Sequence, residues 1–211
     1  MEKKTKCLLM MKLQDSTIKE YIDKTASNEA MPAGGSGVAL CAALAAALAE
    51  MVAKITLDKK RFAEKGDRVK EIAAIMGVNR NHMLNYMDRD SESYQKVLDA
   101  YELPKHTEEE ILVRSGKINE ALKLATVVQL NVAKRGYNLL SLIDEITNLV
   151  KGGIQADGKV SMMICRTAIF GAILNVKNNL AIIKDKSFVE NVQSICSNIE
   201  LELENNFIVK C

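Results

Sequence analysis

The sequence has little of what a β-rich fold needs. Its 211 residues include no Trp, only 2 Pro and 11 Gly, and aromatic residues make up 4%. Ala, Leu, Met, Glu and Lys dominate instead, and these residues favour helices over strands. The composition therefore predicts an all-α protein rather than a β-sandwich or barrel.

An excess of charge of one sign is also missing. The formal net charge is +2, which gives no indication of a general nucleic-acid-binding surface. Hydrophobic residues make up 48% and charged residues 27%, an ordinary soluble balance that excludes disordered and collagen-like classes. The 5 cysteines are scattered, odd in number and without a Cys-x-x-Cys pair. We therefore expect reduced thiols in a cytoplasmic protein.

Long hydrophobic runs are absent as well. The basic residues 2–6 precede only five apolar residues before Lys12, which is too short for the core of an export signal. The most apolar stretch, 38–49, stops at Glu50, well short of the roughly 20 residues that a bilayer requires. The sequence therefore predicts a soluble protein with no membrane contact.

Helix signals divide the chain into several segments. Thr17 and Glu20 form a capping box that starts a first helix, which should end before the Met31-Pro32 pair. An Ala/Leu-rich helix follows from 38 to about 57, and we expect it to be central and buried on nearly all sides, Leu44 included. A third helical region runs to 101 and should be broken or bent near Gly66 or Gly77. A fourth runs from Thr107 to about 150, with a bend or interruption expected at Gly116 or Gly136. The last two run from about 157 to 183 and from 187 to about 205. We predict a single multihelical domain over 13–211 behind a tail of residues 1–12.

The segment 32–37 holds three glycines in four positions, just before the Ala/Leu-rich helix. A glycine turn that leads into a helix N-terminus exposes unpaired N–H groups and is a natural anion site. Gly34, Gly35 and Ser36 are therefore candidate binding residues. The segment lacks the Lys-Ser/Thr ending of a P-loop, and a plain tight turn between two helices is the alternative reading.

Three carboxylates are candidates for chemistry. Asp88 and Asp90 lie two residues apart on an expected helix, so their side chains point about 200° apart. One of them could enter a cleft while the other is solvated, although a charged outer face explains both. Asp157 precedes an apolar helix and could simply be an N-cap.

Other chemical patterns are weak or missing. His82 and His106 are the only histidines and lie on separate elements, so no Ser-His-Asp arrangement can be assembled. No residue spacing indicates a metal site. Lys59 and Lys60 form a basic cluster with Arg61, which is either a solvated helix end or a partner for an anionic ligand.

Several separated segments match one family in order and spacing. They are residues 31–36, 51–53, 59–62, 87–94, 103–109, 157–160, 170–172, 175–176 and 179–180. Together they span about 13 to 200 and resemble the cyclodeaminase/cyclohydrolase family. That family includes the C-terminal domain of formimidoyltransferase-cyclodeaminase and a methenyltetrahydrofolate cyclohydrolase.

The chain departs from the family pattern at three positions. Ala33 replaces the first glycine of the family's Pro-Gly-Gly-Gly-Ser run, and Ala156 stands where a Ser is common. Gln129 stands where relatives often carry a Pro, a change we expect to straighten a helix more than to disturb a site. None of these departures removes an acidic candidate.

The resemblance implies a homodimeric enzyme that acts on one-carbon tetrahydrofolates without a metal or organic cofactor. It assigns Asp90 as the catalytic acid/base, with Asp88 as the fallback, and Asp157 as a residue that holds the pterin. By charge complementarity, the Gly34–Ser36 turn with Lys59 and Lys60 would bind anionic parts of folate. Cyclodeaminase and cyclohydrolase activity both stay open, and a catalytically inactive folate-binding or scaffold oligomer is the alternative.

Overall fold

A computed structural model describes residues 12–58 and 64–206 of the chain. All its secondary structure in these ranges is helical, which confirms the predicted all-α class. The elements are the 3-10 helix η1 (Leu13–Asp15) and the α-helices α1 (Ile18–Thr25), α2 (Gly34–Leu57), α3 (Gly66–Glu102), α4 (Glu108–Leu149), α5 (Gly153–Leu180) and α6 (Lys186–Asn206).

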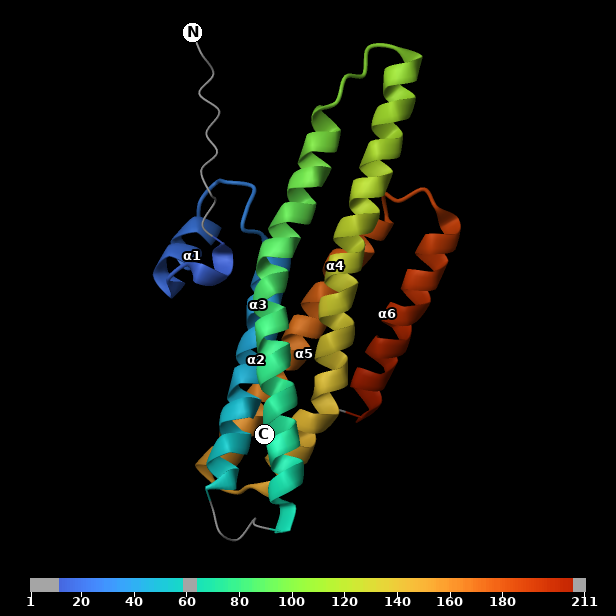
Figure 1. Ribbon diagram of the computed structural model, residues 1–211. Coiled ribbons are helices and arrows are strands. Elements are labelled where there is room, and N and C mark those ends of the chain that lie inside the picture. Colours follow the sequence, from blue (N-terminus) through green and yellow to red (C-terminus); the bar gives the residue numbers. More distant parts are fainter. Residues whose placement is uncertain (1–11, 59–63, 207–211) are drawn as a thin grey trace.

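Four long helices form the core of the molecule (Figure 1). Helix α2 packs against α3 and α5, and α4 packs against the same two helices, so the four form a closed bundle. Helix α6 lies along α4 and α5, and η1 packs against α3. Helices α3 and α4 extend beyond the start of α2 as a long hairpin (Figure 1).

Two helix starts behave as the sequence predicts. The Thr17 hydroxyl accepts a hydrogen bond from the Glu20 backbone N–H, and the Glu20 carboxylate accepts one from the Thr17 N–H. Thr107 and Glu110 form the same reciprocal pair at the start of α4. These capping boxes place α1 and the hairpin tip.

Gly77, Gly116 and Gly136, three of the four glycines expected to bend or interrupt helices, lie inside continuous helices, whereas Gly66 is the first residue of α3. At Gly77 a Cβ atom would meet the Glu50 carboxylate at 3.3 Å, and at Gly136 it would meet Ile169 at 2.8 Å. These positions admit a neighbouring side chain at close range, which is a packing role and not a helix break. The expected interruption at Gly77 or Gly136 is therefore wrong, because packing outweighs the modest cost of a mid-helix glycine. The alternative at Gly66 coincides with the start of α3.

The expectation for Leu44 is also wrong. Alanines line the buried side of α2 and allow its neighbours to approach closely, among them Ala39, Ala45, Ala46 and Ala49 at 0% exposure. The Leu44 side chain, in contrast, is 49% exposed on the outer side of α2. In the single chain a lysine there reaches water, so Leu44→Lys is not expected to abolish folding of the chain.

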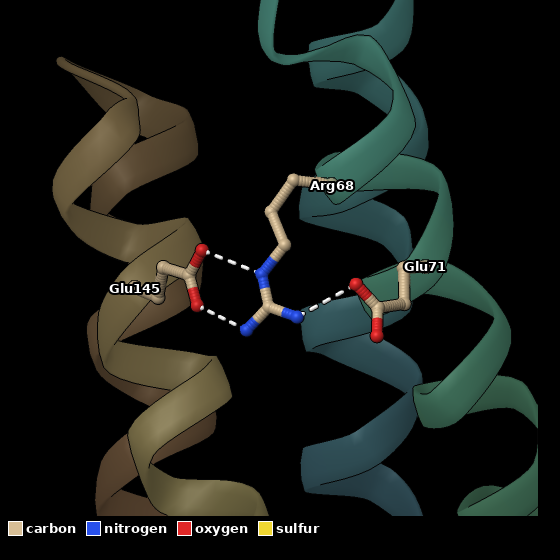
Figure 2. A network of polar contacts seen from close by, with 3 residues as sticks. All are labelled: Arg68, Glu71 and Glu145. Carbon is tan, nitrogen blue, oxygen red and sulfur yellow. Dashed lines mark hydrogen bonds and ion pairs between the residues drawn. The ribbon is translucent and has the colours of Figure 1, made fainter.

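A three-residue ion-pair network joins the open ends of α3 and α4 (Figure 2). The Arg68 guanidinium of α3 donates to both carboxylate oxygens of Glu145 on α4, at 2.9 and 2.7 Å, and to Glu71 at 2.7 Å. A bidentate pair fixes direction as well as distance. The network therefore holds the two longest helices in register at the end opposite the hairpin loop.

Helices α2 and α5 are long and apolar enough to cross a membrane by length and composition alone. Core helices of soluble proteins pass the same test. About half of the most apolar stretch of each is buried inside the bundle, 50% in α2 and 44% in α5. We therefore read both as core helices.

Candidate active site

Asp90 lies on α3 at the level where α2 begins. Its side chain is 9% exposed, and its Oδ1 atom accepts a hydrogen bond of 2.6 Å from Nε2 of Gln129 on α4. The Ser36 backbone N–H at the start of α2 also donates to the carboxylate. Three core helices therefore meet at this one buried acid.

The glycine segment forms the first turn of α2, whereas the sequence predicts a helix start at 38. Gly35 faces the acid so closely that a Cβ atom there would lie 2.2 Å from Asp90 Oδ1 and 2.5 Å from Gln129 Nε2. A Cβ atom at Gly34, in contrast, would meet nothing within 4 Å outside the adjoining backbone of its own helix in the described chain. The anion next to this helix N-terminus is thus a carboxylate of the protein itself, in a position that helix N–H groups stabilise.

Helix α1 closes the site from one side. The hydroxyl of Tyr21, a residue 5% exposed, donates to Ser36 Oγ at 3.1 Å. Ser36 itself is fully buried. The contact ties α1 to the turn of α2 that holds Asp90.

Burial raises the pKa of Asp90 above its ordinary value, and the hydrogen bonds from Gln129 and Ser36 offset part of that rise. A carboxyl group with a raised pKa holds its proton more readily than a solvated one and is a stronger base once ionised. That property suits a general acid or base.

The raised pKa also predicts a stability effect of Asp90→Asn. An unfolded Asp titrates near about pH 4, and between that pH and the higher pKa of the folded protein the folded state binds more protons, so wild-type stability falls as pH rises. The Asn variant lacks this loss. Its free energy of unfolding relative to the wild type should therefore increase above about pH 4 and level off once the pH exceeds the pKa of folded Asp90. Urea unfolding from pH 4 to 8 measures it, and a difference that does not change with pH would contradict the prediction.

Asp88 points to a different neighbour. Its Oδ1 accepts a hydrogen bond of 2.6 Å from the Leu13 backbone N–H, while its Oδ2 is buried without a partner in the described part of the chain. Burial raises its pKa, which the Leu13 contact and Lys12 lower in part. Asp88 thus holds η1 against α3, and the two acids diverge as their spacing on a helix predicts.

Asp157 lies inside α5 and not at its cap, because the helix begins four residues earlier and its N-cap is Gly152. On the next turn, Ser161 donates to the carbonyl of Ala45 on α2. Ala45 is ten residues, or about 15 Å, beyond Gly35, and Asp157 lies four residues, or about 6 Å, further from the start of α2 than Ser161. Asp157 and Asp90 therefore lie about 20 Å apart along the bundle. The structure does not bring these two acids together, and Lys59 and Lys60 lie outside the described residues.

Gln129 is the site residue that the sequence analysis misjudged. The sequence predicts that it straightens its helix more than it disturbs a site, yet it is 2% exposed and contacts Asp90 directly. A signal was present, since Gln129 is polar amid the apolar run of Val127, Val128 and Leu130. A polar residue on a buried helix face needs a hydrogen-bond partner, and here that partner is the candidate acid.

Comparison with known proteins places this geometry in a family. Residues 17–198 match the formiminotransferase-cyclodeaminase family. The methenyltetrahydrofolate cyclohydrolase of Methylorubrum extorquens is 32% identical over 179 residues, which cover 83% of this chain and 85% of that protein. The formimidoyltransferase-cyclodeaminase of Mus musculus is 28% identical over 187 residues, 89% of this chain but 35% of the longer mouse protein.

A solved structure shares the fold. The crystal structure of a formiminotetrahydrofolate cyclodeaminase from Thermotoga maritima matches with a TM-score of 0.82 at 26% sequence identity. The match covers 91% of this chain and 92% of that one. Fold, sequence and length agree, and the chain belongs to the formiminotransferase-cyclodeaminase family.

Proposed function

We propose that this protein is a one-carbon tetrahydrofolate enzyme, either a formimidoyltetrahydrofolate cyclodeaminase or a methenyltetrahydrofolate cyclohydrolase. The relatives with these names support the substrate class. The observation that carries the chemistry is the buried carboxyl of Asp90, held by Gln129 and Ser36 where three helices meet.

Both reactions pass through a tetrahedral carbon. In the cyclodeaminase, the second folate nitrogen adds to the formimidoyl carbon, and the carbon–nitrogen bond to the leaving group then breaks to release ammonia and methenyltetrahydrofolate. In the cyclohydrolase, water adds to the methenyl carbon, a proton is lost, and one ring carbon–nitrogen bond opens to give formyltetrahydrofolate. Each route moves protons to or from nitrogen or oxygen and passes through a cation that a carboxylate stabilises.

In this proposal Asp90 carries the proton and faces the cationic carbon. Asp88 keeps η1 in place and is the fallback acid. No metal or organic cofactor is required by this chemistry. Anion binding by Gly34, Lys59 and Lys60 and pterin binding by Asp157 stay predictions. Pterin binding by Asp157 conflicts with the geometry of one chain, because Asp157 and Asp90 lie about 20 Å apart and a bicyclic pterin does not bridge that distance.

Two absorbance assays test the proposed function. Added formimidoyltetrahydrofolate should produce the absorbance of methenyltetrahydrofolate in a cyclodeaminase, and added methenyltetrahydrofolate should lose it faster than without protein in a cyclohydrolase. Folate binding in calorimetry with neither change would overturn the proposal in favour of a binding or scaffold protein.

We further propose that the protein is cytoplasmic and works as a homodimer. Helices α2 and α5 lie side by side, and each leaves a row of large apolar side chains exposed at helical spacing. The exposed side chains are Leu44 and Met51 on α2 and Val160, Met163 and Leu174 on α5. From their positions relative to the Ser161–Ala45 contact, both rows lie on the same side of the α2–α5 pair. A surface of this kind suits a second copy of the chain.

Leu44→Glu is therefore expected to shift the protein from dimer to monomer at micromolar concentration with its helix content retained. The matched control is Leu112→Glu, at a position that is 75% exposed near the hairpin tip, which should leave the dimer intact. Sedimentation velocity and circular dichroism measure both properties. A wild-type protein that sediments as a monomer would reject the dimer.

A further inference from the structure

We propose that Gln129 is a positioning residue that holds the Asp90 carboxyl in place in both of its protonation states. The proposal rests on the proposed function only for the consequence in catalysis. The contact itself can be measured without any activity.

The Gln129 side chain is tightly enclosed next to the Asp90 carboxyl. It is 2% exposed, its Nε2 donates to Asp90 Oδ1 at 2.6 Å, and a Cβ atom at Gly35 would lie 2.5 Å from the same Nε2. The amide is therefore confined between the first turn of α2 and the acid on α3. Its position along α4 is fixed by the buried Val128 and Leu130 beside it.

The second polar atom of the amide is the unusual feature. Gln129 Oε1 is buried and has no hydrogen-bond partner among the described residues. A buried acceptor without a partner is costly, so such an atom in a native structure calls for an explanation. With Asp90 ionised, Nε2 donates to the carboxylate and Oε1 is idle.

Protonation of Asp90 gives that idle oxygen a role. A protonated carboxyl carries an O–H donor, and half a turn of the amide presents Oε1 as its acceptor. Gln129 can thus bond either form of the acid without moving its backbone. A methionine of similar size bonds neither form, and a glutamate adds a second acid.

The groups that face Asp90 from the packed elements are neutral. They are Gln129 from α4 and the Ser36 N–H from α2, with the Tyr21 hydroxyl of α1 bonded behind Ser36. On α3 the nearby Asp88 is turned to η1, where Lys12 and Asp15 face it. Gln129 is therefore the side-chain contact through which the titration of Asp90 can be altered.

The test is the titration of Asp90 followed by carboxyl ¹³C NMR on protein with labelled aspartate, with the resonance assigned by its absence in Asp90→Asn. In Gln129→Met, the ionised form loses a donor, so the Asp90 midpoint should rise by about one pH unit. The matched control is Gln95→Met, which removes an amide donor on an exposed face of the same helix as Asp90, where Gln95 donates to Asp99 at 2.7 Å. In this control the Asp90 midpoint should stay at its wild-type value.

A second variant keeps the test decisive if Gln129→Met does not fold. Gln129→Glu preserves the size of the side chain and places two acids in contact, so Asp90 should titrate in two coupled steps. An Asp90 titration that is unchanged in whichever variant folds would overturn the proposal.

Turnover separates this proposal from the function. If Asp90→Asn keeps the wild-type rate while the Gln129 variants move the Asp90 midpoint, the catalytic role assigned to Asp90 within the proposed function fails and the positioning contact stands. If Asp90→Asn is inactive, the acid limb of the kcat/KM profile in Gln129→Met should move with the NMR midpoint. A limb that stays in place would overturn the catalytic consequence.

Discussion

Asp90→Asn is expected to lower the rate of the one-carbon reaction by about 10²- to 10⁴-fold, the usual contribution of a general acid or base. The change keeps the size of the side chain and an oxygen that can still accept from Gln129, but it removes the charge and the exchangeable proton. Because the substrate's other contacts are unaffected, KM and folate affinity should change much less than kcat. Steady-state absorbance assays and calorimetry measure the two effects separately.

Asp88→Asn and Asp157→Asn are the matched controls. The Asp88 side chain bonds Leu13 and points away from Asp90, so its variant should keep most of the activity and lose some stability at η1. Asp157→Asn should weaken folate binding more than turnover if the pterin contact exists. If Asp90→Asn turns over at the wild-type rate while Asp88→Asn is dead, the catalytic acid is Asp88. Full activity in all three would reject the carboxylate mechanism.

The sequence predicted those features that depend on local chemistry. The capping box at Thr17, the helix start at Thr107, the all-α class and the divergence of Asp88 and Asp90 follow from residue propensity, hydrogen bonding and rotation within one helix. The family resemblance is also confirmed by the match of residues 17–198 to the family. It could be found from the sequence because it rests on the order of many short motifs. Residue types along one segment suffice for each of these.

The features that the sequence did not predict depend on contacts between helices. From the sequence, Gly35 is predicted to lie in a turn, and its contact with Asp90, 55 positions later, is known only from the structure. The sequence likewise predicts only that Gln129 lies in a helix, because its hydrogen-bond partner Asp90 is 39 residues away. Leu44 is apolar inside an apolar helix, and only the placement of α3 and α5 shows that its own side of α2 is left open.

The close approach of Gly35 to Asp90 leads to a prediction that can be compared with the same substitution at Gly34. An added Cβ would lie 2.2 Å from Asp90 Oδ1, so in Gly35→Ala the carboxyl and the Gln129 amide must both move. Gly35 and its neighbour Gly34 have ordinary backbone angles, since the positive φ among the described glycines occurs at Gly152. Backbone strain therefore does not enter, and any effect comes from the displaced side chains.

We expect Gly35→Ala to lower kcat by about 10²-fold, because a displacement on the order of 1 Å at a catalytic group has that effect. Overpacking should also lower the free energy of unfolding by about 1–3 kcal/mol. Gly34→Ala, one residue away in open space, should keep wild-type activity and a free energy of unfolding within about 0.5 kcal/mol. Turnover and urea unfolding of the two variants side by side measure the difference. Equal activity in both would mean that the first turn of α2 does not hold Asp90 in its working position.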